Sequence, residues 1–253
     1  MPEIARKIDG LVDRLANRVI WRFARQRRSL ATETPLVSFT FDDVPDSALD
    51  HGATILERHG ARGTFYIAGG LAGQVEPDRT LISPAGCGEL LARGHEIGCH
   101  TFSHRRIRDM SVAALSRDLD RNADYLQNVG VTPAAANFAF PYNAAWPLAR
   151  TELRRRYRTC RGGGEAINRG PVDPLMLKAV EIRQPEQHAR ALTRWIDDVV
   201  ERPGWLVFFT HDIAPSPTPY GCSPEAFDHL VRYAVDKGCQ VLPVDRVLNR
   251  INW

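Results

Sequence analysis

Short apolar runs alternate with longer amphipathic segments along most of the chain after residue 35. The runs are rich in β-branched and aromatic residues and predict strands at 36–41, 63–68, 95–99, 137–140, 157–160, 179–182, 205–210 and 240–243. The segments between them repeat apolar residues at helical spacing and predict helices at 47–59, 111–128, 146–156, 187–202 and 224–237. This alternation favours an α/β fold whose parallel sheet has enough strands to close into a barrel.

Residues 1–30 have a different pattern, in which the apolar residues recur at steps of three and four: Ile4, Ile8, Leu11, Leu15, Val19 and Phe23. This spacing predicts an amphipathic helix over residues 3–28. Eight Arg or Lys and three acidic residues give the segment a net charge of +5, whereas the whole chain carries +3. We favour a helix laid against the domain with its charged side in water. The alternative is a helix on an anionic membrane surface.

The composition is that of a soluble globular protein, since 43% of the 253 residues are hydrophobic and 25% are charged. We therefore expect a helical extension at 1–30 and one barrel domain at 31–253. The small net charge argues against a nucleic-acid partner. Because no long apolar window and no apolar signal core occur, we expect a cytoplasmic protein, peripheral to the inner membrane face if the basic helix binds lipid. Five cysteines without a CxxC pair predict buried, reduced thiols.

Two short motifs suggest a metal centre. Asp42 and Asp43 end the first strand of the barrel, and His100 and His104 follow the third. If residues 100–104 begin a helical turn, both imidazoles lie on one face and reach one ion. One carboxylate and two imidazoles are a common ligand set for a catalytic divalent metal, and the second carboxylate could then act as a base. The alternative for the aspartates is capping of the helix that begins near Ser47.

Other polar groups also follow predicted strands directly, namely Pro141-Tyr142 and His211. Active sites of β/α barrels lie at the carboxyl ends of the strands, so we expect these loops to meet around one pocket. His211 follows the most apolar strand and would be a partly desolvated acid or base. Its alternative is a rim histidine hydrogen-bonded to Asp212.

These motifs resemble the polysaccharide deacetylases, the carbohydrate esterase family 4 with its NodB homology domain. The resemblance covers residues 35–245 and rests on the segments TFDD (40–43), HTFSH (100–104), FAFPYN (138–143) and FFTHD (208–212). It implies a distorted parallel (β/α) barrel and the removal of acetyl groups from N-acetylated sugars.

The resemblance also implies roles for individual residues. Asp42 matches the catalytic base, His211 the general acid, and Tyr142 the residue whose backbone N–H helps to hold the oxyanion. The metal ligands would be Asp43, His100 and His104, with zinc as the expected ion and cobalt, nickel or manganese as alternatives. We expect the sugar to contact Pro141, Tyr142, Trp146 and Tyr220, since aromatic side chains stack on sugars.

The sequence departs from the family pattern in the third motif. The family usually carries an Arg two residues before the proline, where this chain has Ala139. That Arg orients the base Asp, and Arg161 is our candidate substitute. Asn143 replaces the usual Gly and can adopt a left-handed conformation. Asp173 is a candidate partner for the acid histidine, with a turn before Pro174 as its alternative.

The resulting hypothesis is a hydrolase of non-peptide C–N bonds that uses one divalent ion. It would remove an N-acetyl group, or alternatively an O-acetyl or N-formyl group, from a sugar, an oligosaccharide or a glycan precursor. One alternative is a cyclic amide or imide hydrolase of the allantoinase-like type. The other is a glycan-binding pseudoenzyme, which the missing Arg at position 139 favours.

Overall fold

The computed structural model describes the backbone of residues 2–23 and 27–253 and the side chains of residues 9–23 and 27–253. The described strands form a curled parallel sheet in the order β6-β5-β4-β3-β2-β9-β8, and β10 pairs with the first residues of β2. The strands are β2 (Leu36–Asp42), β3 (Thr64–Ile67), β4 (Glu96–Cys99), β5 (Asn137–Ala139), β6 (Thr159–Arg161), β8 (Val180–Glu181), β9 (Trp205–Thr210) and β10 (Gln240–Val241). The predicted parallel α/β barrel is confirmed, and the sheet stays open between β6 and β8.

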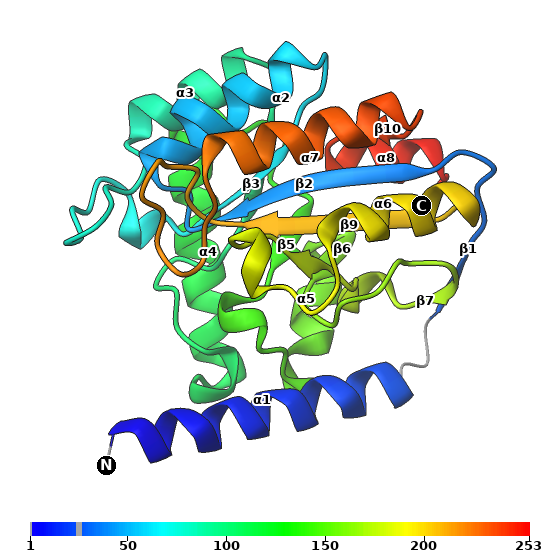
Figure 1. Ribbon diagram of the computed structural model, residues 1–253. Coiled ribbons are helices and arrows are strands. Elements are labelled where there is room, and N and C mark those ends of the chain that lie inside the picture. The colour runs from blue at the N-terminus through cyan, green and yellow to red at the C-terminus, as the bar shows by residue number, and fades with distance from the viewer. Residues whose placement is uncertain (1, 24–26) are drawn as a thin grey trace.

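Helices pack around the outside of the sheet, and Figure 1 shows α1 apart from the others, below the strands. The helices are α1 (Pro2–Phe23), α2 (Thr54–Arg58), α3 (Pro84–Ala92), α4 (Val112–Asn128), α5 (Arg150–Arg156), α6 (Leu192–Glu201), α7 (Pro224–Asp236) and α8 (Val244–Arg250). None of the helices in the described part of the chain has the length and apolar character that crossing a bilayer requires.

All eight predicted strands occur within a few residues of their expected positions. The predicted helix at 47–59 is interrupted, because residues 48–53 form a π-helical segment before α2 begins. The predicted helix at 187–202 begins later, as α6 at Leu192. The carboxylates of Asp42 and Asp43 bond to Arg161 and Arg79 and not to the start of this helix, so the capping alternative for the aspartates is wrong.

Several elements were not predicted. A short antiparallel pair joins β1 (Arg28–Leu30) to β7 (Gly170–Val172), so the chain is already attached to the barrel domain at residues 28–30. β7 contains Pro171, which sequence patterns place outside central strands but which an edge strand tolerates. The helix α3 contains two glycines that weaken its periodic signal, although Ser83 caps it and Pro84 occupies its first turn.

The central strands β2 and β9 are buried along their whole length. Strands of a parallel sheet that is covered on both faces read as continuous apolar runs, as these do. Aromatic rings hold the strands together, since Phe41 stacks on Phe65 at 4.5 Å and Phe39 on Phe208 at 5.4 Å between ring centroids. This core fixes the carboxyl ends of the strands, where the predicted site residues lie. All five cysteines are free and buried, as expected.

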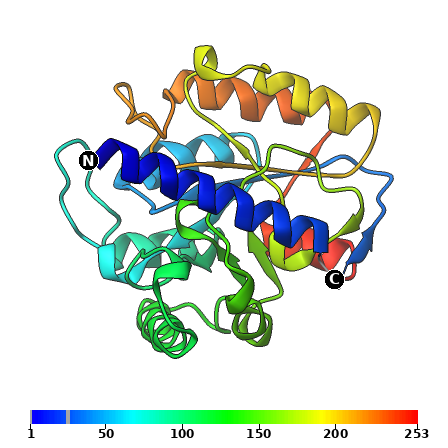
Figure 2. The same cartoon turned by 90° about the horizontal axis from the view of Figure 1, so that it is seen from below.

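The helix α1 lies against the barrel domain and crosses it in the view of Figure 2. Its contact face is not the apolar stripe but a mixed face that contains Asp13, Ala16, Asn17, Ile20 and Trp21. The stripe instead points outward, with Leu11, Leu15, Val19 and Phe23 between 47% and 67% exposed. The expectation that α1 buries its apolar side was therefore wrong. The side chains of Ile4 and Ile8 lie outside the described residues.

Glu96, at the start of β4, generates a prediction about stability. Its carboxylate accepts hydrogen bonds from Thr64, from Asn137 and from the backbone N–H of Asp245. Burial, together with the nearby Asp245 charge, raises the pKa of Glu96 from 4.5 to about 7. Between these values the folded state holds a proton that the unfolded state has released. The free energy of unfolding should therefore fall as the pH rises from 4.5 to 7, by about 1–3 kcal/mol.

Urea unfolding of the wild type and of Glu96→Gln at several pH values measures how the free energy of unfolding depends on pH. The variant, which carries no titrating proton at this position, should lose less stability than the wild type between about pH 5 and pH 8. Glu89→Gln removes an exposed carboxylate paired with Arg93 and serves as the control. An identical pH dependence in the wild type and Glu96→Gln would contradict the prediction.

Candidate active site

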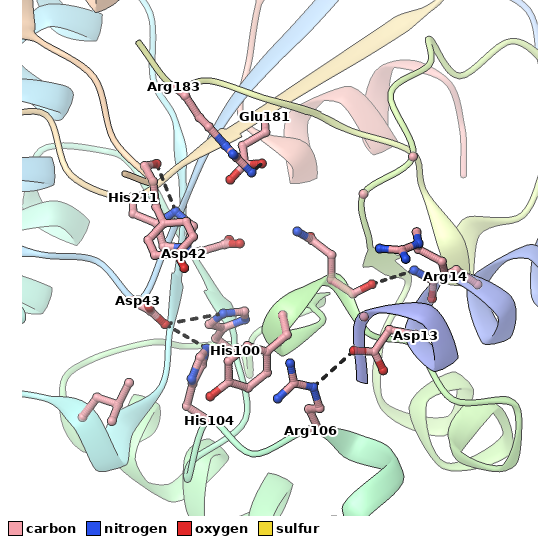
Figure 3. Close-up of a pocket in the computed structure, with 18 of the residues that line it drawn as sticks. Asp13, Arg14, Asp42, Asp43, His100, His104, Arg106, Glu181, Arg183 and His211 are labelled. Atoms are coloured by element: carbon pink, nitrogen blue, oxygen red, sulfur yellow. Dashed lines mark hydrogen bonds and ion pairs between the residues drawn. The ribbon is translucent and has the colours of Figure 1, made fainter. Parts of the chain in front are cut away.

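The described residues at the carboxyl ends of the strands surround a cleft of about 960 Å³. Figure 3 shows Asp42 and Asp43 from the end of β2, the histidines after β4, and His211 after β9. The loops after these strands thus meet around one pocket. The helix α1 supplies part of the wall through Asp13, Arg14, Asn17, Arg18 and Trp21.

Asp43, His100 and His104 form a compact cluster in which one ligand atom of each lies within 4.8 Å of the others. The Nε2 atoms of His104 and His100 lie 3.0 and 3.7 Å from Oδ1 of Asp43. Nδ1 of His100 donates to the carbonyl oxygen of Ala139 at 2.9 Å, which leaves Nε2 as the acceptor that faces Asp43. The three predicted metal ligands are thus brought together.

The two histidines meet through a loop and not through a helical turn. Thr101 and His104 both have left-handed backbones, with φ of 63° and 51°. The His104 N–H donates to Oγ1 of Thr101 at 3.0 Å, and Asp118 of α4 accepts the N–H of Phe102 at 2.8 Å. The helical-turn hypothesis for 100–104 was therefore wrong. Side-chain hydrogen bonds hold a loop conformation that aims both rings at Asp43.

Left-handed backbone conformations concentrate at this site. Of the eight non-glycine residues with positive φ in the described chain, six lie in the three loops that form the site: Asp43, Val44, Thr101, His104, Tyr142 and Asn143. The predicted left-handed conformation of Asn143 is confirmed, with φ of 53°. Such conformations are costly for β-branched and aromatic residues and typically mark functional sites.

The electrostatics of the cluster favour cation binding. Burial would raise the pKa of Asp43, but the nearby imidazoles and Arg79 outweigh it and lower that pKa. Burial, with the neighbouring His100, lowers the pKa of His104 to about 4. At neutral pH the carboxylate is ionised and this imidazole is neutral, which are the forms that ligate metals.

The donor set also fits a divalent ion chemically. Oδ1 of Asp43 is buried and has no hydrogen-bond partner among the described residues, while Oδ2 accepts from Arg79 at 3.2 Å. A buried carboxylate oxygen without a donor is costly unless a cation lies beside it. One carboxylate oxygen and two imidazole nitrogens, with further positions open, match the preferences of zinc and related ions.

Asp42 is paired with Arg161, the last residue of β6. One guanidinium nitrogen, Nη2, contacts both carboxylate oxygens, and Nη1 donates to Oδ1 of Asn143 at 2.5 Å. Both residues are buried, and the rings of Phe209 and Tyr66 flank the guanidinium at 4.6 and 5.6 Å. Asp42 therefore has a guanidinium partner in a nearly dry environment while it borders the cleft.

The register of the sheet explains why Arg161 reaches this position. Ala139 and Arg161 are direct partners across the parallel pair β5 and β6. Side chains at paired positions of neighbouring strands point to the same side of the sheet. The small, fully buried Ala139 thus leaves room beside Arg161.

His211 follows β9 at the rim of the cleft. Its Nδ1 lies 3.3 Å from the carbonyl oxygen of Tyr220, and the two rings are 5.5 Å apart. Asp212 is turned away and accepts from the N–H and the hydroxyl of Thr218, at 2.7 and 2.6 Å. The alternative of a His211–Asp212 hydrogen bond is therefore wrong.

Tyr142 forms an aromatic wall of the cleft and is 51% exposed. Its ring lies 4.8 Å from the ring of His104, and the Arg106 guanidinium stacks on it at 4.2 Å. Arg106 in turn pairs with Asp13 of α1 at 3.2 Å, as Figure 3 shows. The N-terminal helix is thereby connected to the site through one ion pair.

Two further candidates lie elsewhere. Asp173 accepts the N–H of Leu175 and pairs with Arg150 at 2.8 Å, so the structure places it in a turn and away from His211. Trp146 packs against the hydrophobic core and is not among the residues that line the cleft. Pro141 is buried and shapes the loop, whereas Tyr220 does border the cleft.

Sequence reasoning missed several residues of the cleft, among them Arg79, Arg106, Glu181 and Arg183. Arg79 contacts Asp43, and Arg183 pairs with Glu181. No motif marks these positions. The sequence holds one signal for Arg79. Two adjacent carboxylates repel each other, and Arg161 was expected to compensate only Asp42, so Asp43 also called for a cationic partner.

Comparison with solved structures finds the same fold. The peptidoglycan N-acetylglucosamine deacetylase Bc1960 aligns with a TM-score of 0.60 and 15% identity, covering 86% of this chain and 90% of its own. Peptidoglycan deacetylase PdaC from Bacillus subtilis aligns with a TM-score of 0.56 and 20% identity, covering 87% and 92%. A family 4 acetyl xylan esterase from Clostridium thermocellum, solved with a cobalt ion, aligns with a TM-score of 0.56 and 20% identity. The alignment covers 85% of this chain and 91% of the esterase.

At these identities the likeness establishes the fold and nothing further. Comparison with curated proteins finds no sequence match. The family model for polysaccharide deacetylases, however, matches residues 29–156, which is just over half of the chain. This match includes the aspartate pair and both histidines of the cluster, and the chain therefore belongs to the polysaccharide deacetylase family.

Proposed function

We propose that this protein is a metal-dependent hydrolase that removes an N-acetyl group from a sugar, an oligosaccharide or a glycan precursor. The observation that carries the proposal is the adjacency, at one cleft, of the largely buried Asp43–His100–His104 donor set and the buried Asp42–Arg161 pair. O-acetyl and N-formyl groups carry a similar carbonyl and are the neighbouring substrate classes to test.

Asp43, His100 and His104 would hold the ion, with zinc the best match to two imidazoles and one carboxylate. When bound, such an ion polarises the scissile carbonyl and lowers the pKa of a coordinated water to about 7. Cobalt, nickel and manganese accept the same donors, so the proposal includes them as alternatives.

Asp42 would act as the general base that accepts a proton from the attacking water. It borders the cleft, and Arg161 holds its carboxylate in one orientation. A fixed carboxylate at hydrogen-bond reach of the water transfers the proton without first reorganising. Arg161 would act as a positioning residue, since it touches the base and not the substrate.

His211 would donate a proton to the leaving amine. The carbonyl oxygen of Tyr220 orients its ring through Nδ1, which leaves Nε2 available on the cleft side. An amine leaves readily only when it is protonated, so a histidine at this position would complete the cleavage. Its partial exposure allows it to recover the proton from solvent.

Tyr142 would contribute its backbone N–H to the oxyanion. The loop hydrogen bonds, from Asn143 N–H to Phe140 and from Ala144 N–H to Pro141, leave the Tyr142 N–H free among the described residues. Removing one such donor typically costs about 2.7–4 kcal/mol in the transition state. The rings of Tyr142 and Tyr220 would offer apolar surface to a sugar.

The first prediction concerns metal binding. The purified protein should bind about one divalent ion per chain. His104→Ala should reduce the zinc affinity by at least about 100-fold, because one of the three proposed ligands is lost. Isothermal titration with zinc measures both values, and His229→Ala, which removes an exposed histidine far from the cluster, is the control. Equal zinc affinity in the wild type and His104→Ala would refute the assignment of the ligands.

The second prediction concerns turnover. The zinc-loaded wild type should release acetate from N-acetylglucosamine oligosaccharides, and Asp42→Asn should lower kcat by about 10²–10⁴. Zinc content should not change, since the three ligands are intact. Asp228→Asn, which alters a carboxylate paired with His59, should keep full activity.

The same assay separates the alternatives. Turnover of cyclic amides without release of acetate would indicate a ring-opening hydrolase. Equal sugar binding by the wild type and Asp42→Asn, with no turnover of any substrate, would indicate a glycan-binding pseudoenzyme.

The third prediction concerns Arg161. Arg161→Ala leaves the buried Asp42 carboxylate without a cation and should lower the free energy of unfolding by about 3–5 kcal/mol. Arg161→Lys keeps the charge but loses the two-oxygen contact, so it should fold and show a kcat reduced by about tenfold or more. Arg158→Ala removes an exposed arginine that contacts Asn249 and should change stability by less than about 1 kcal/mol. Urea unfolding and acetate release measure these effects, and wild-type values for both Arg161 variants would show that the pair is dispensable.

A further inference from the structure

The outward face of α1 carries a stripe of exposed apolar side chains that no part of the described chain covers. Of the eleven large hydrophobic residues exposed in the described part of the protein, five lie on this one helix: Leu11, Val12, Leu15, Val19 and Phe23. Residues four apart lie on the same face of an α-helix, so Leu11, Leu15 and Val19 form a continuous line. Contiguous apolar surface of this kind usually marks an interaction site.

Polar contacts hold α1 in place and keep the stripe facing outward. Asn17 donates to the carbonyl oxygen of Asn143 at 2.8 Å and accepts the N–H of Ala145 at 3.1 Å. The indole of Trp21 donates to the carbonyl oxygen of Met176 at 3.2 Å. The helix is thus fixed by one face while the apolar face stays free to bind something else.

Charge around the stripe is arranged asymmetrically. The acidic residues Asp9 and Asp13 both pair with Arg108, and Asp13 is buried whereas Asp9 is partly exposed. Arg14, Arg18 and Arg22 are exposed, and none of them makes an ion pair within the described residues. At 3.6 residues per turn these three arginines lie along one edge of the stripe. Over residues 9–23, the outer surface of α1 therefore combines an apolar line with a basic edge on one side.

We propose that α1 binds the surface of a bilayer that contains anionic lipids. The stripe of Leu11, Leu15, Val19 and Phe23 would enter the boundary between headgroups and acyl chains, and the arginines would lie at the lipid phosphates. An amphipathic helix with this distribution is typical of interfacial binding, and each cation near an anionic leaflet adds to the affinity. A second copy of the chain is a poorer occupant, because it offers the same arginines and, in an antiparallel pair of stripes, would bring the two basic edges to the same side.

The position of the stripe relates it to the cleft. Arg14, Arg18 and Trp21 border the cleft and belong to the same helix as the stripe. Figure 3 shows Arg14 and Asp13 of α1 facing the space beside Arg106 and the histidines. A bilayer bound by α1 would therefore lie next to the mouth of the cleft, within reach of a substrate held at the headgroups. This consequence rests on the proposed function, whereas membrane binding itself does not.

Co-sedimentation of the full chain with vesicles tests the proposal. Binding should be strong with phosphatidylcholine vesicles containing about one-quarter phosphatidylglycerol, weak with phosphatidylcholine alone, and reduced by added salt. Leu15→Asp and Val19→Asp should each lower the partition coefficient by about tenfold or more, because a charge replaces an inserted apolar group. Leu148→Asp, at a site 69% exposed outside α1, should bind as the wild type does.

A charge variant tests the basic border separately. Arg22→Glu, which is exposed and does not border the cleft, should weaken binding to the anionic vesicles and leave binding to neutral vesicles unchanged. Thermal unfolding confirms that each variant is folded.

Three results would overturn the proposal. They are a wild type that does not bind the anionic vesicles, Leu15→Asp binding like the wild type, and a lipid-free wild-type dimer that Leu15→Asp converts to a monomer. The last result would assign the stripe to a second copy of the chain. Vesicle binding is measured without turnover, so its failure would leave the acetate-release test untouched.

Discussion

Two adjacent carboxylates at the end of a buried strand set the main physical constraint on this site. Asp42 and Asp43 are only 3% and 7% exposed, and like charges so close together repel strongly without compensation. Each carboxylate has its own neighbouring arginine or imidazole groups in the structure. Arg161 contacts Asp42, whereas Arg79 and two imidazoles surround Asp43. The two neighbouring groups thereby acquire different environments, which is what a division into base and ligand requires.

The parallel sheet makes this separation achievable. Strands β2, β4, β5, β6 and β9 all end at the same edge, so residues far apart in the chain arrive together there. Arg161 reaches Asp42 from β6, where it is the register partner of Ala139. A guanidinium can reach Asp42 from β5 or from β6, provided that the paired residue on the other strand has a small side chain, as Ala139 does here. The loops complete the site at the cost of left-handed backbone at several non-glycine residues.

The N-terminal helix α1 contacts the site with one face and leaves its apolar face exposed. Its contact face is polar and fits the loop after β5, while Asp13 connects it to the arginine that stacks on Tyr142. Its apolar face points away from the domain. One helix thus borders the cleft with one edge and, on another, presents an apolar surface that the described residues leave uncovered. The surface that would bind lipid is therefore continuous with the wall of the cleft, because Arg14 and Arg18 belong to both.

Local patterns in the chain predicted the alternation of strands and helices and the placement of Asp42, His100 and His211 at the carboxyl ends of strands. They also predicted an amphipathic helix over residues 3–28, which the structure describes as Pro2–Phe23. These features follow from local periodicity and from motif spacing, which a one-dimensional pattern records directly. Long-range contacts were needed to establish that Arg161, a candidate from the sequence, does contact Asp42. They also show that a loop and not a helical turn joins the two histidines, and that Asp173 and Trp146 lie away from the cleft. Only the tertiary structure decided which face of α1 is buried. Periodicity shows that a helix has two faces, but long-range contacts such as the Asn17–Asn143 hydrogen bond determine which of them the domain binds.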